Sequence, residues 1–319
     1  MTLPVLWVLN LDAELELQRG WSCLAEGHRP DTLSYATTKP VQHLIASHAE
    51  RFAALLPNTA LVQRGETPLP EQLRGSPGLC WCPTPSALTR LRRAGATATG
   101  GAAFDVLIAV NHRRFCADLG QTLPAARFVD NLKDMNALLS QPSATGEWLC
   151  KRPLGFAGRG QRRIAASDET RSHVRPDNQR WLSESVPHGG LQIEPHVSIL
   201  AEFSVHGLLQ RDQKFTLGQV CQQHVDEHRA WSHSTTALSY PLSATQLAQL
   251  RDEAERVAEA LAKAGYFGPF SVDSYIWQHP TGAVQLNPRS EINARMTMAY
   301  PIGMGQTWLE DLVTAMGGT

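Results

Sequence analysis

The chain has 319 residues, of which 42% are hydrophobic and 18% charged, and its formal net charge is −1 at pH 7. This composition is typical of a globular enzyme with room for two or three domains. The near-neutral charge, without blocks of one sign, argues against a nucleic-acid-binding surface, and no apolar run is long enough to span a bilayer.

The first ten residues predict a buried strand rather than a signal peptide. Residues 5–9 are a continuous apolar run of strand length, with no basic segment before it and with Asp12 and Glu14 soon after. A run of this kind is typical of a strand covered on both faces.

Helix and strand patterns then alternate. Apolar residues recur at helical spacing over 40–55, and Thr84 followed by Pro85 marks the start of a second helix. Short apolar segments predict two further strands, at 60–62 and 79–82. This alternation favours a parallel α/β layer over residues 1 to about 110.

Neither the cysteines nor the histidines suggest a metal or disulfide framework. A chain of this length does not need disulfides, so the six cysteines are expected to be buried free thiols in the cytoplasm. His224 and His228 have the spacing of a metal pair, with His233 nearby, but no thiolate or carboxylate pattern completes a ligand set. We expect them to be polar loop residues.

The best-defined helix precedes a hairpin. Ser243 and Gln246 form a capping box, an apolar stripe follows, and Gly265 ends the helix. An alternating strand at 268–277, a turn at 280–282 and a second strand at 283–287 then predict a β-hairpin.

A glycine-rich segment follows a strand that ends in a lysine. The strand is expected at 148–151 and ends in Lys151, and Gly155, Gly158 and Gly160 come next, with Arg159 among them. Backbone N–H groups in such a loop can point at phosphate oxygens. The spacing matches neither a Rossmann nor a Walker A motif. A plain hairpin is an equally good interpretation of this segment alone.

The late hairpin carries candidate metal ligands. Asp273 and Asn287 lie on its two strands, so their side chains are expected to face one another. Carboxylate and amide oxygens suit Mg²⁺ that bridges nucleotide phosphates. If the strand continues, Arg289 projects from the same face and could hold a carboxylate or phosphoryl group. The alternative is a solvated aspartate and arginine beside a turn.

In their order along the chain, these segments resemble the ATP-grasp superfamily, which includes D-alanine–D-alanine ligase and biotin carboxylase. Lys151 and the loop 155–160 are similar to the family's lysine and flexible flap, and 192–205 is similar to its hinge segment. The 283–289 strand resembles its metal hairpin. Residues 110–115 resemble the usual Asn-x-Lys start, with arginine in place of lysine, and Leu123-Pro124 follows where the family often has such a pair.

The resemblance implies an α/β (α+β) fold: an N-terminal parallel α/β domain followed by a two-subdomain ATP-grasp fold. The expected boundaries are 1–110 for the first domain, 111–190 for the lid subdomain and 191–319 for the C-terminal subdomain.

The resemblance also implies roles for individual residues. Lys151 and Arg289 would be catalytic. The nucleotide would contact Arg113, Lys151, Gly155, Gly158, Arg159, Gly160, Glu194, His196, Val197 and Glu202. The metal ligands would be Asp273, Gln285, Asn287 and Glu291.

Two departures from the family pattern stand out. Gln285 occupies the position of a bridging glutamate, and a neutral amide is a poor bridge between two cations. We expect Glu291 to turn back toward the site and restore the charge. The alternatives are that Glu291 lies on the surface or pairs with Arg289 or Arg295. The hinge from Glu194 to Glu202 is also one residue longer than the family spacing.

The function implied is an ATP- and Mg²⁺-dependent ligase that activates a carboxylate as an acyl phosphate for attack by an amine. Alternatives are an ATP-grasp phosphotransferase and a catalytically silent ATP-binding module. The expected partners are a small-molecule carboxylate and an amine, without nucleic acid or membrane. A homodimer is compatible with the sequence.

Overall fold

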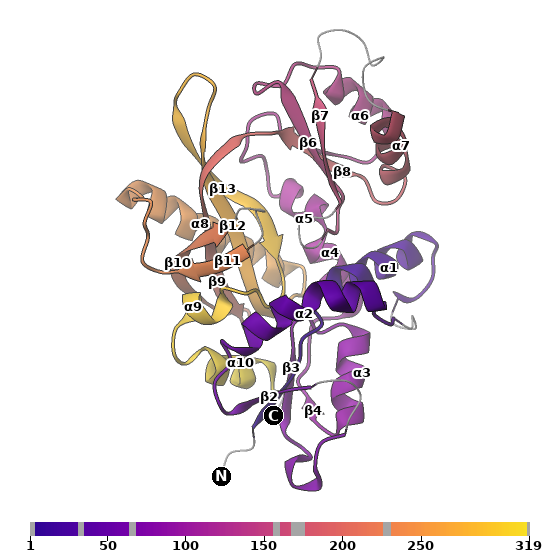
Figure 1. Cartoon of the computed structure of the whole chain (residues 1–319), viewed down its shortest axis with the longest axis vertical. Helices are drawn as coiled ribbons and strands as arrows, with labels where there is room; N and C mark the ends of the chain where they lie inside the picture. Colours follow the sequence, from indigo (N-terminus) through magenta and orange to yellow (C-terminus); the bar gives the residue numbers. More distant parts are fainter. Residues whose placement is uncertain are drawn as a thin grey trace.

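Three β-sheets, each covered by helices, make up the computed structural model, which describes residues 4–30, 35–63, 68–155, 160–166, 176–225 and 231–317 (Figure 1). Seen in Figure 1, the first sheet lies at the bottom of the molecule, the largest in the middle and the third at the top. The functional side chains come from the surfaces between them.

The first sheet is parallel, as the alternating pattern predicts. Its strands lie in the order β2-β1-β3-β4, with the bounds β1 (Val5–Val8), β2 (Ala60–Val62), β3 (Pro77–Cys80) and β4 (Thr97–Ala98). A short 3₁₀ helix, η2 (Glu71–Leu73), precedes β3. All four residues of β1 are buried, because helices cover both faces of this sheet.

Successive residues of β1 point to opposite faces, and this alternation assigns the helices. Trp7 packs with residues of α2 (Lys39–Ala53) and α10 (Trp308–Met316), whereas Leu6 packs with α3 (Pro85–Ala94). The helix α1 (Ala13–Ala25), which the sequence patterns did not predict, packs instead against α4 (Phe104–Asn111).

The largest sheet is antiparallel and has the order β11-β10-β9-β12-β13. Its strands are β9 (Ser198–Leu209), β10 (Phe215–Val225), β11 (Trp231–Thr235), β12 (Gly268–Gln278) and β13 (Val284–Asn293). The helix α8 (Ala244–Lys263) covers one face with its apolar stripe and begins at the predicted capping box of Ser243 and Gln246. The short helix α9 (Tyr300–Met304) lies against β9 and β10.

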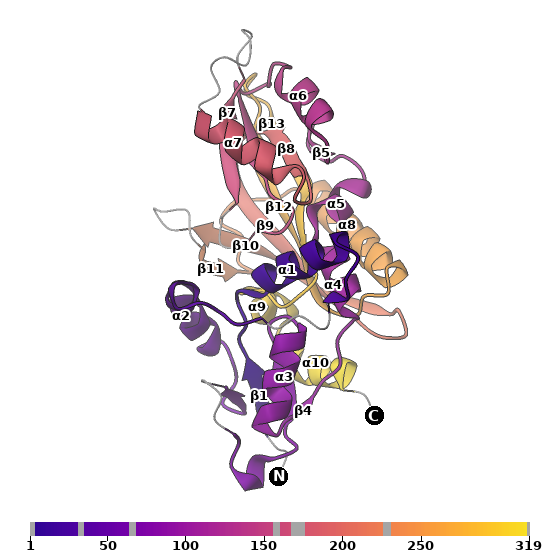
Figure 2. The ribbon, with the colours of Figure 1, turned by 90° about the vertical axis from the view of Figure 1, so that its right-hand side faces the viewer.

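The third sheet forms a lid above the largest one (Figures 1 and 2). Its order is β5-β8-β6-β7, with β5 (Arg127–Val129), β6 (Glu147–Lys151), β7 (Gln161–Ala165) and β8 (Leu191–Pro195). Apolar side chains of one face pack against α6 (Leu132–Leu139) and α7 (Pro176–Ser185). The lid sheet extends to Pro195, past the boundary expected at 190; the other domain boundaries stay predictions.

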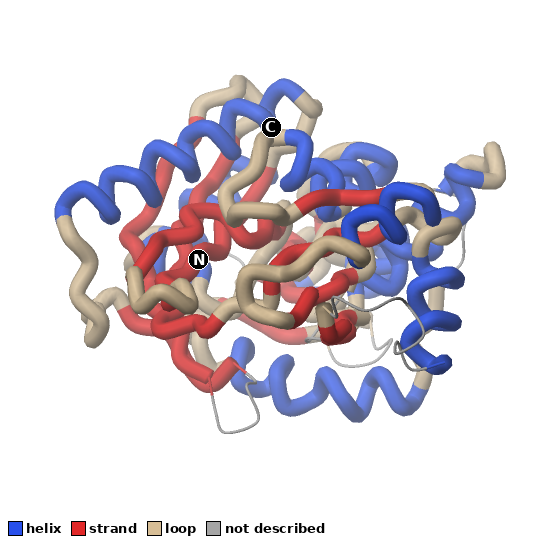
Figure 3. Tube along the Cα trace, turned by 90° about the horizontal axis from the view of Figure 1, so that it is seen from above, coloured by secondary structure: helices blue, strands red, loops and turns tan. Residues whose placement is uncertain are grey.

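The opposite face of the lid sheet borders a cavity that it shares with β13 and with α5 (Arg113–Asp118). Seen from above, helices lie around the central strands (Figure 3). Residues from strands far apart in the sequence therefore meet in this region.

Candidate active site

The register of the β12–β13 hairpin decides which side chains face Asp273. Asp273 pairs with Glu291, Tyr275 with Asn287, and Trp277 with Gln285. The expectation that Asp273 and Asn287 face one another is therefore wrong. The reason is a bulge: one residue of β12, Ser274, stands opposite three residues of β13, 288–290.

Proline at position 288 explains where the bulge forms. Proline has no N–H to donate to a sheet ladder and is found at bulges and edges of sheets. Because two extra residues are inserted, the alternation of faces is kept, and Glu291 arrives opposite Asp273. Glu291 thus lies on the strand position opposite Asp273, while the expectation that it supplies charge to a metal site stays a prediction.

Asp273 and Glu291 form an acidic pair with Asn293 beside it. The Asn293 amide donates to Asp273 Oδ2 at 3.0 Å, and Gln223 Nε2 donates to Asp273 Oδ1 at 3.3 Å. Burial and then the neighbouring Glu291 charge raise the pKa of Asp273 to about 7, although Arg295 and Asn293 act in the opposite direction. A cation at this point would relieve the repulsion between the two carboxylates.

The other two residues expected at the metal do not lie there. Gln285 is exposed near the end of the hairpin, opposite Trp277, and Asn287 is buried beside Tyr275. Neither residue is paired with Asp273, since Gln285 lies opposite Trp277 and Asn287 opposite Tyr275 across the bulge. The register thus brings Asp273 and Glu291 together, and the ligand set itself stays a prediction.

Arg289 is turned away from Asp273 by the bulge. Its guanidinium pairs with Glu253 of α8 and donates to the carbonyl of Gly120. The side chain is buried, at 2% exposure. The expectation that it shares the face of Asp273 assumed a continuous strand, and the bulge breaks that continuity.

Lys151 and Glu194 lie together on the face of the lid sheet that borders the cavity. Lys151 ends β6, Glu194 lies on the neighbouring strand β8, and Lys151 Nζ contacts Glu194 Oε1 at 2.5 Å. Both side chains are nearly buried. They are on the opposite face from Trp148 and Ile193, which pack against the lid helices.

Of the glycine loop, Gly155 and Gly160 lie within the described residues, whereas Gly158 and Arg159 lie outside them. Gly160 has a φ of +76°, a conformation that suits glycine, and its carbonyl accepts from the N–H of Arg152. The loop thus begins and ends next to Lys151.

Arg113 joins the lid to the acidic pair. Its Nη2 lies 2.9 Å from Glu291 Oε1, and its Nε donates to the carbonyl of Arg152 at 3.1 Å. Burial alone would raise the pKa of Glu291, but the charges of Arg113 and Lys151 hold it below its usual value. Glu291 is therefore charged and already paired.

The hinge between the lid and the largest sheet contains the extra residue noted in the sequence. The pairing of β9 with β12 shifts between Ile276 and Trp277 and leaves Leu200 without a partner position. This bulge absorbs one residue, and Glu202 then pairs with Tyr275, two positions from the partner of Asp273.

The two hinge residues His196 and Val197 point in different ways. His196 Nδ1 contacts Glu147 Oε2 at 3.0 Å, outside the cleft. Val197 is buried and packs with Leu123, Tyr275 and Trp277. Of the two side chains, Val197 is thus the one that joins the apolar wall between lid and sheet.

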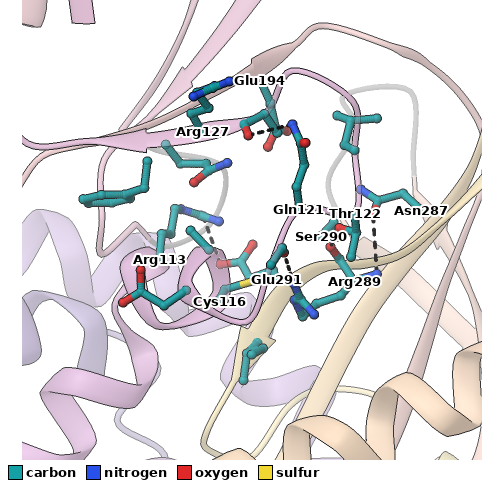
Figure 4. Close-up of a pocket in the computed structure, with 18 of the residues that line it drawn as sticks. Arg113, Cys116, Gln121, Thr122, Arg127, Glu194, Asn287, Arg289, Ser290 and Glu291 are labelled. Carbon is teal, nitrogen blue, oxygen red and sulfur yellow. Dashed lines mark hydrogen bonds and ion pairs between the residues drawn. The ribbon is translucent and has the colours of Figure 1, made fainter. Parts of the chain in front are cut away.

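A cavity of about 310 Å³ opens where these elements meet (Figure 4). Arg113, Glu194 and Glu291 face it from three different elements, and Asn287 and Arg289 border it from β13. Charged groups of both signs and an apolar wall suit a ligand with an anionic part and a flat apolar part.

No protein-family model matches the chain, and no curated protein matches it in sequence. Solved structures do. D-alanyl-alanine synthetase A from Vibrio cholerae aligns over 99% of both chains with a TM-score of 0.55 and 12% identity. D-cycloserine synthetase aligns over 98% of both chains with a TM-score of 0.50 and 13% identity.

The biotin carboxylase domain of a Hydrogenobacter thermophilus 2-oxoglutarate carboxylase, in complex with MgADP and bicarbonate, is a third such structure. It matches 100% of this chain and 71% of that one, with a TM-score of 0.54 and 12% identity. The chain has an ATP-grasp fold. At such low identities the similarity concerns the fold, and the site must be argued from its own residues.

Four residues near the acidic pair, Asn293, Arg295, Glu14 and Asn111, were not predicted from the sequence. Asn293 and Arg295 belong to the segment 291–295, which has the same spacing of polar residues as the segment 285–289. The two differ at the first position, where the later segment has the carboxylate of Glu291 and the earlier one has the amide of Gln285. The charge of Glu291 was the signal that favoured the later segment. Arg295 forms an ion pair with Glu14 of α1, which no sequence spacing could indicate. Asn111 exchanges two hydrogen bonds with the backbone of Ala294.

The donor set suits Mg²⁺ rather than a metal held by protein alone. Among the residues that the structure describes, no three His, Cys, Asp or Glu side chains are grouped to hold a metal ion. Two carboxylates and one amide oxygen are what Mg²⁺ takes from a protein when water and phosphate complete its shell. His224 and His233 stack on neighbouring strands, and His228 lies outside the described residues.

Two further sequence expectations concern the surroundings of the site. All six cysteines are free thiols. In the described part of the chain, no helix is both long and apolar enough to cross a membrane.

Proposed function

We propose that the protein is an ATP-dependent ligase that activates a carboxylate as an acyl phosphate for attack by an amine. The observation that carries the proposal is a connected cluster: Asp273 lies opposite Glu291, Asn293 donates to Asp273, Arg113 pairs with Glu291, and the Lys151 charge acts on Glu291 as well. Arg113 and Glu291 line the cavity. Phosphoryl transfer needs mainly positioning and neutralisation of charge, and this set of groups supplies both.

Lys151 and Arg113 are the groups that would hold the phosphates. Each pairs with a carboxylate, Lys151 with Glu194 and Arg113 with Glu291. Phosphate oxygens would replace these partners. The base would lie toward Val197 and Tyr275, and Glu202 would face the ribose, as the resemblance implies. Gly155, Gly160 and the residues between them would close over the phosphates.

Asp273, Glu291 and Asn293 would hold Mg²⁺, which neutralises the charge that develops on the transferred phosphoryl group. Arg295 lies next to these ligands and above the ring of Trp81, at 5.7 Å from its centroid. Its pairing with Glu14 links the metal-binding strand to the N-terminal domain. A carboxylate substrate could bind between these two parts.

The reaction then takes two steps, phosphorylation of the carboxylate and attack by the amine. The substrate carboxylate oxygen bonds to the terminal phosphorus and the bond to the ADP oxygen breaks. The amine nitrogen next bonds to the acyl carbon, phosphate leaves with the bonding pair, and the amine loses a proton. No protein nucleophile is required. The lid must exclude water, since water would hydrolyse the acyl phosphate.

The similar structures support this reaction class by what their names state. One is a D-alanyl-alanine synthetase, one a D-cycloserine synthetase, and one is a carboxylase crystallised with MgADP and bicarbonate. The substrates we infer are accordingly small molecules, and the free cysteines fit a cytoplasmic protein.

A catalytically silent module is less well supported than a ligase. Its main argument was the neutral Gln285, and Gln285 does not oppose Asp273. A phosphotransferase that stops at the phosphorylated product remains the second candidate, since it would need the same phosphate and metal groups.

Release of ADP and phosphate, measured over a panel of amino acids, separates the three functions. A ligase releases both products when a carboxylate and an amine are present together. A phosphotransferase releases ADP with a single acceptor and retains the phosphate on it. A silent module binds MgADP but releases nothing, and this result would refute the proposal.

A further inference from the structure

Arg289 is bound on two sides by elements that do not otherwise belong to the hairpin. Its guanidinium pairs with Glu253 of α8 and donates to the Gly120 carbonyl. The contact is returned, because the Thr122 hydroxyl donates to the Arg289 carbonyl at 2.7 Å. A buried arginine is thus placed between α8 and the segment 119–126.

Arg256, which lies on α8 one turn after Glu253, makes the same two kinds of contact. It contacts both oxygens of Glu253, at 2.6 and 3.1 Å, and its Nη1 donates to the Leu119 carbonyl at 2.5 Å. Two arginines therefore share one carboxylate, and each binds one of two successive carbonyls. We call Glu253, Arg256 and Arg289 the arginine clamp.

The segment held by the clamp forms a wall of the cavity. It runs from the end of α5 to the start of β5 without regular secondary structure, and Gly120, Gln121 and Thr122 all line the cavity. Leu123 follows directly and is 2% exposed, packed against Val197, Tyr275 and Trp277. Within the segment, the Gln121 amide donates to the Ala126 carbonyl at 3.1 Å.

We propose that Arg289 is a positioning residue for the base end of the nucleotide. It holds segment 119–126 so that Leu123 completes the apolar wall with Val197 and Tyr275. This inference rests on the proposed function for the identity of the ligand, but the clamp itself is independent of it. Arg289 belongs to the bulge and borders the same cavity as Arg113 and Glu291. Its guanidinium is held by Glu253 and the Gly120 carbonyl, so we assign it a positioning role rather than a part in phosphoryl transfer.

Arg289 should be sensitive to substitution because two groups, the Glu253 carboxylate and the Gly120 carbonyl, depend on its guanidinium. Removing the guanidinium leaves Glu253 with one partner fewer and the Gly120 carbonyl without its donor, both near a buried surface. Lysine cannot replace it, because a single ammonium does not provide the planar set of donors that spans two acceptors.

The test compares Arg289→Met and Arg289→Lys with Arg251→Met as the matched control. Arg251 lies on α8, as Glu253 and Arg256 do, but it is exposed and donates to the Gly218 carbonyl instead of binding segment 119–126. Binding is measured with two probes, MgADP and magnesium tripolyphosphate, which has phosphates and no base. Hydrogen exchange of 119–126 is followed without nucleotide.

We expect Arg289→Met to weaken MgADP binding about tenfold, the effect of about 1.4 kcal/mol, and to leave tripolyphosphate binding unchanged. Arg289→Lys should be intermediate, Arg251→Met neutral, and exchange in 119–126 faster in both Arg289 variants. If Arg289→Met does not fold, Thr122→Val and Arg256→Met test the same segment.

Equal weakening of both probes, or unchanged exchange in 119–126, would overturn the positioning role. Failure of the wild-type protein to bind MgADP would instead refute the proposed function. In that case faster exchange in the Arg289 variants would still support the clamp, and unchanged exchange would refute it as well.

Discussion

Two segments with the same spacing have different surroundings: one lies within β13, and the other begins in β13 and continues past its end at Asn293. In the first, 285–289, a glutamine, an asparagine and an arginine are spaced two apart; in the second, 291–295, a glutamate, an asparagine and an arginine have the same spacing. The first lies along the outer part of the hairpin and ends in the arginine clamp. The second lies beside Asp273 and ends at the N-terminal domain.

The difference between the segments comes from register. Both have side chains on alternate positions, but the bulge at 288–290 brings only Glu291 opposite Asp273. Asn111 then fixes the second segment through two hydrogen bonds to Ala294, at 2.9 and 3.3 Å. The residues that oppose a motif across the sheet therefore determine its surroundings, and the spacing of its residues alone does not predict them.

The largest difference in Mg²⁺-dependent ADP binding should be between substitutions at the first positions of the two segments, Glu291 and Gln285. Glu291→Gln removes a carboxylate from the proposed metal site, and Gln285→Ala changes an exposed side chain. Even residues that only support metal ligands cost about 10–100-fold when mutated, so Glu291→Gln should reduce the Mg²⁺-dependent gain in ADP affinity at least about 100-fold. Calorimetric titration with ADP, with Mg²⁺ and with a chelator, gives this gain.

Gln285→Ala is the control for this experiment and should leave the gain unchanged. If the two variants had equal effects, or if Gln285→Ala had the larger one, the earlier segment would be the metal-binding one after all. Gln285→Glu should not rescue Glu291→Gln, because position 285 lies opposite Trp277.

The two asparagines provide the next comparison. Asn293→Leu removes an amide that contacts Asp273, whereas Asn287→Leu removes one beside Tyr275 at the cavity. We expect Asn293→Leu to lower the Mg²⁺-dependent gain about tenfold. Asn287→Leu should change ADP affinity by the same factor with and without Mg²⁺. A selective loss of the Mg²⁺ effect in Asn287→Leu would contradict the assignment.

Much of the fold could be predicted from local patterns. The apolar run at 5–9, the capping box at Ser243 and the alternating hairpin strands each depend on neighbours in sequence, and each appears at the expected place. Lys151 could be located for the same reason, as the last residue of a strand before glycines.

The proposed metal site could not be derived in the same way. The bulge depends on how Pro288 meets the neighbouring strand, and the sequence pattern alone suggested a continuous strand. The pairing of Arg295 with Glu14 joins residues far apart in the chain. Such contacts depend on the packing of whole domains and leave no periodic signal.

Arg113 pairs with Glu291 and with no residue of the segment 285–289. Its removal should therefore change ADP binding and metal binding in opposite directions. Arg113→Met should weaken ADP binding about tenfold through loss of a charged contact. In the nucleotide-free protein it should instead strengthen metal binding, because Glu291 is released from its ion pair. Mn²⁺ binding followed by electron paramagnetic resonance measures the second effect.

Arg114→Met is the matched control for Arg113→Met. Arg114 is the exposed neighbour, and it pairs with Asp130 at 2.5 Å. It should change neither measurement. Weaker Mn²⁺ binding in Arg113→Met would mean that Arg113 supports the ligand geometry rather than competing with the metal.

The smallest effect concerns stability and pH. The pKa of Asp273 is raised from its ordinary value of 3.8 to about 7, mainly by burial and then by the Glu291 charge. The folded protein therefore holds this proton more tightly than the unfolded chain does. The resulting stabilisation is complete below about pH 4, declines as the pH rises and is lost once the pH passes about 7. Asp273→Asn mimics the protonated form and should escape this loss.

Without Mg²⁺, the melting temperature of Asp273→Asn should exceed that of the wild type by a difference that grows between about pH 4 and 7 and then levels off. The unfolding entropy of a chain of 319 residues corresponds to roughly 1.5 °C for each kcal/mol, so a difference of a few degrees is expected. Mg²⁺ at pH 8 should stabilise the wild type more than the variant, because only the wild type offers two carboxylates to the ion. Asp212→Asn is the control, since Lys214 lowers the pKa of that exposed carboxyl and its pH dependence has the opposite sign. A melting-temperature difference for Asp273→Asn that shrinks as the pH rises would show that Asp273 is stabilised as the anion. Arg295, and not Glu291, would then dominate its surroundings.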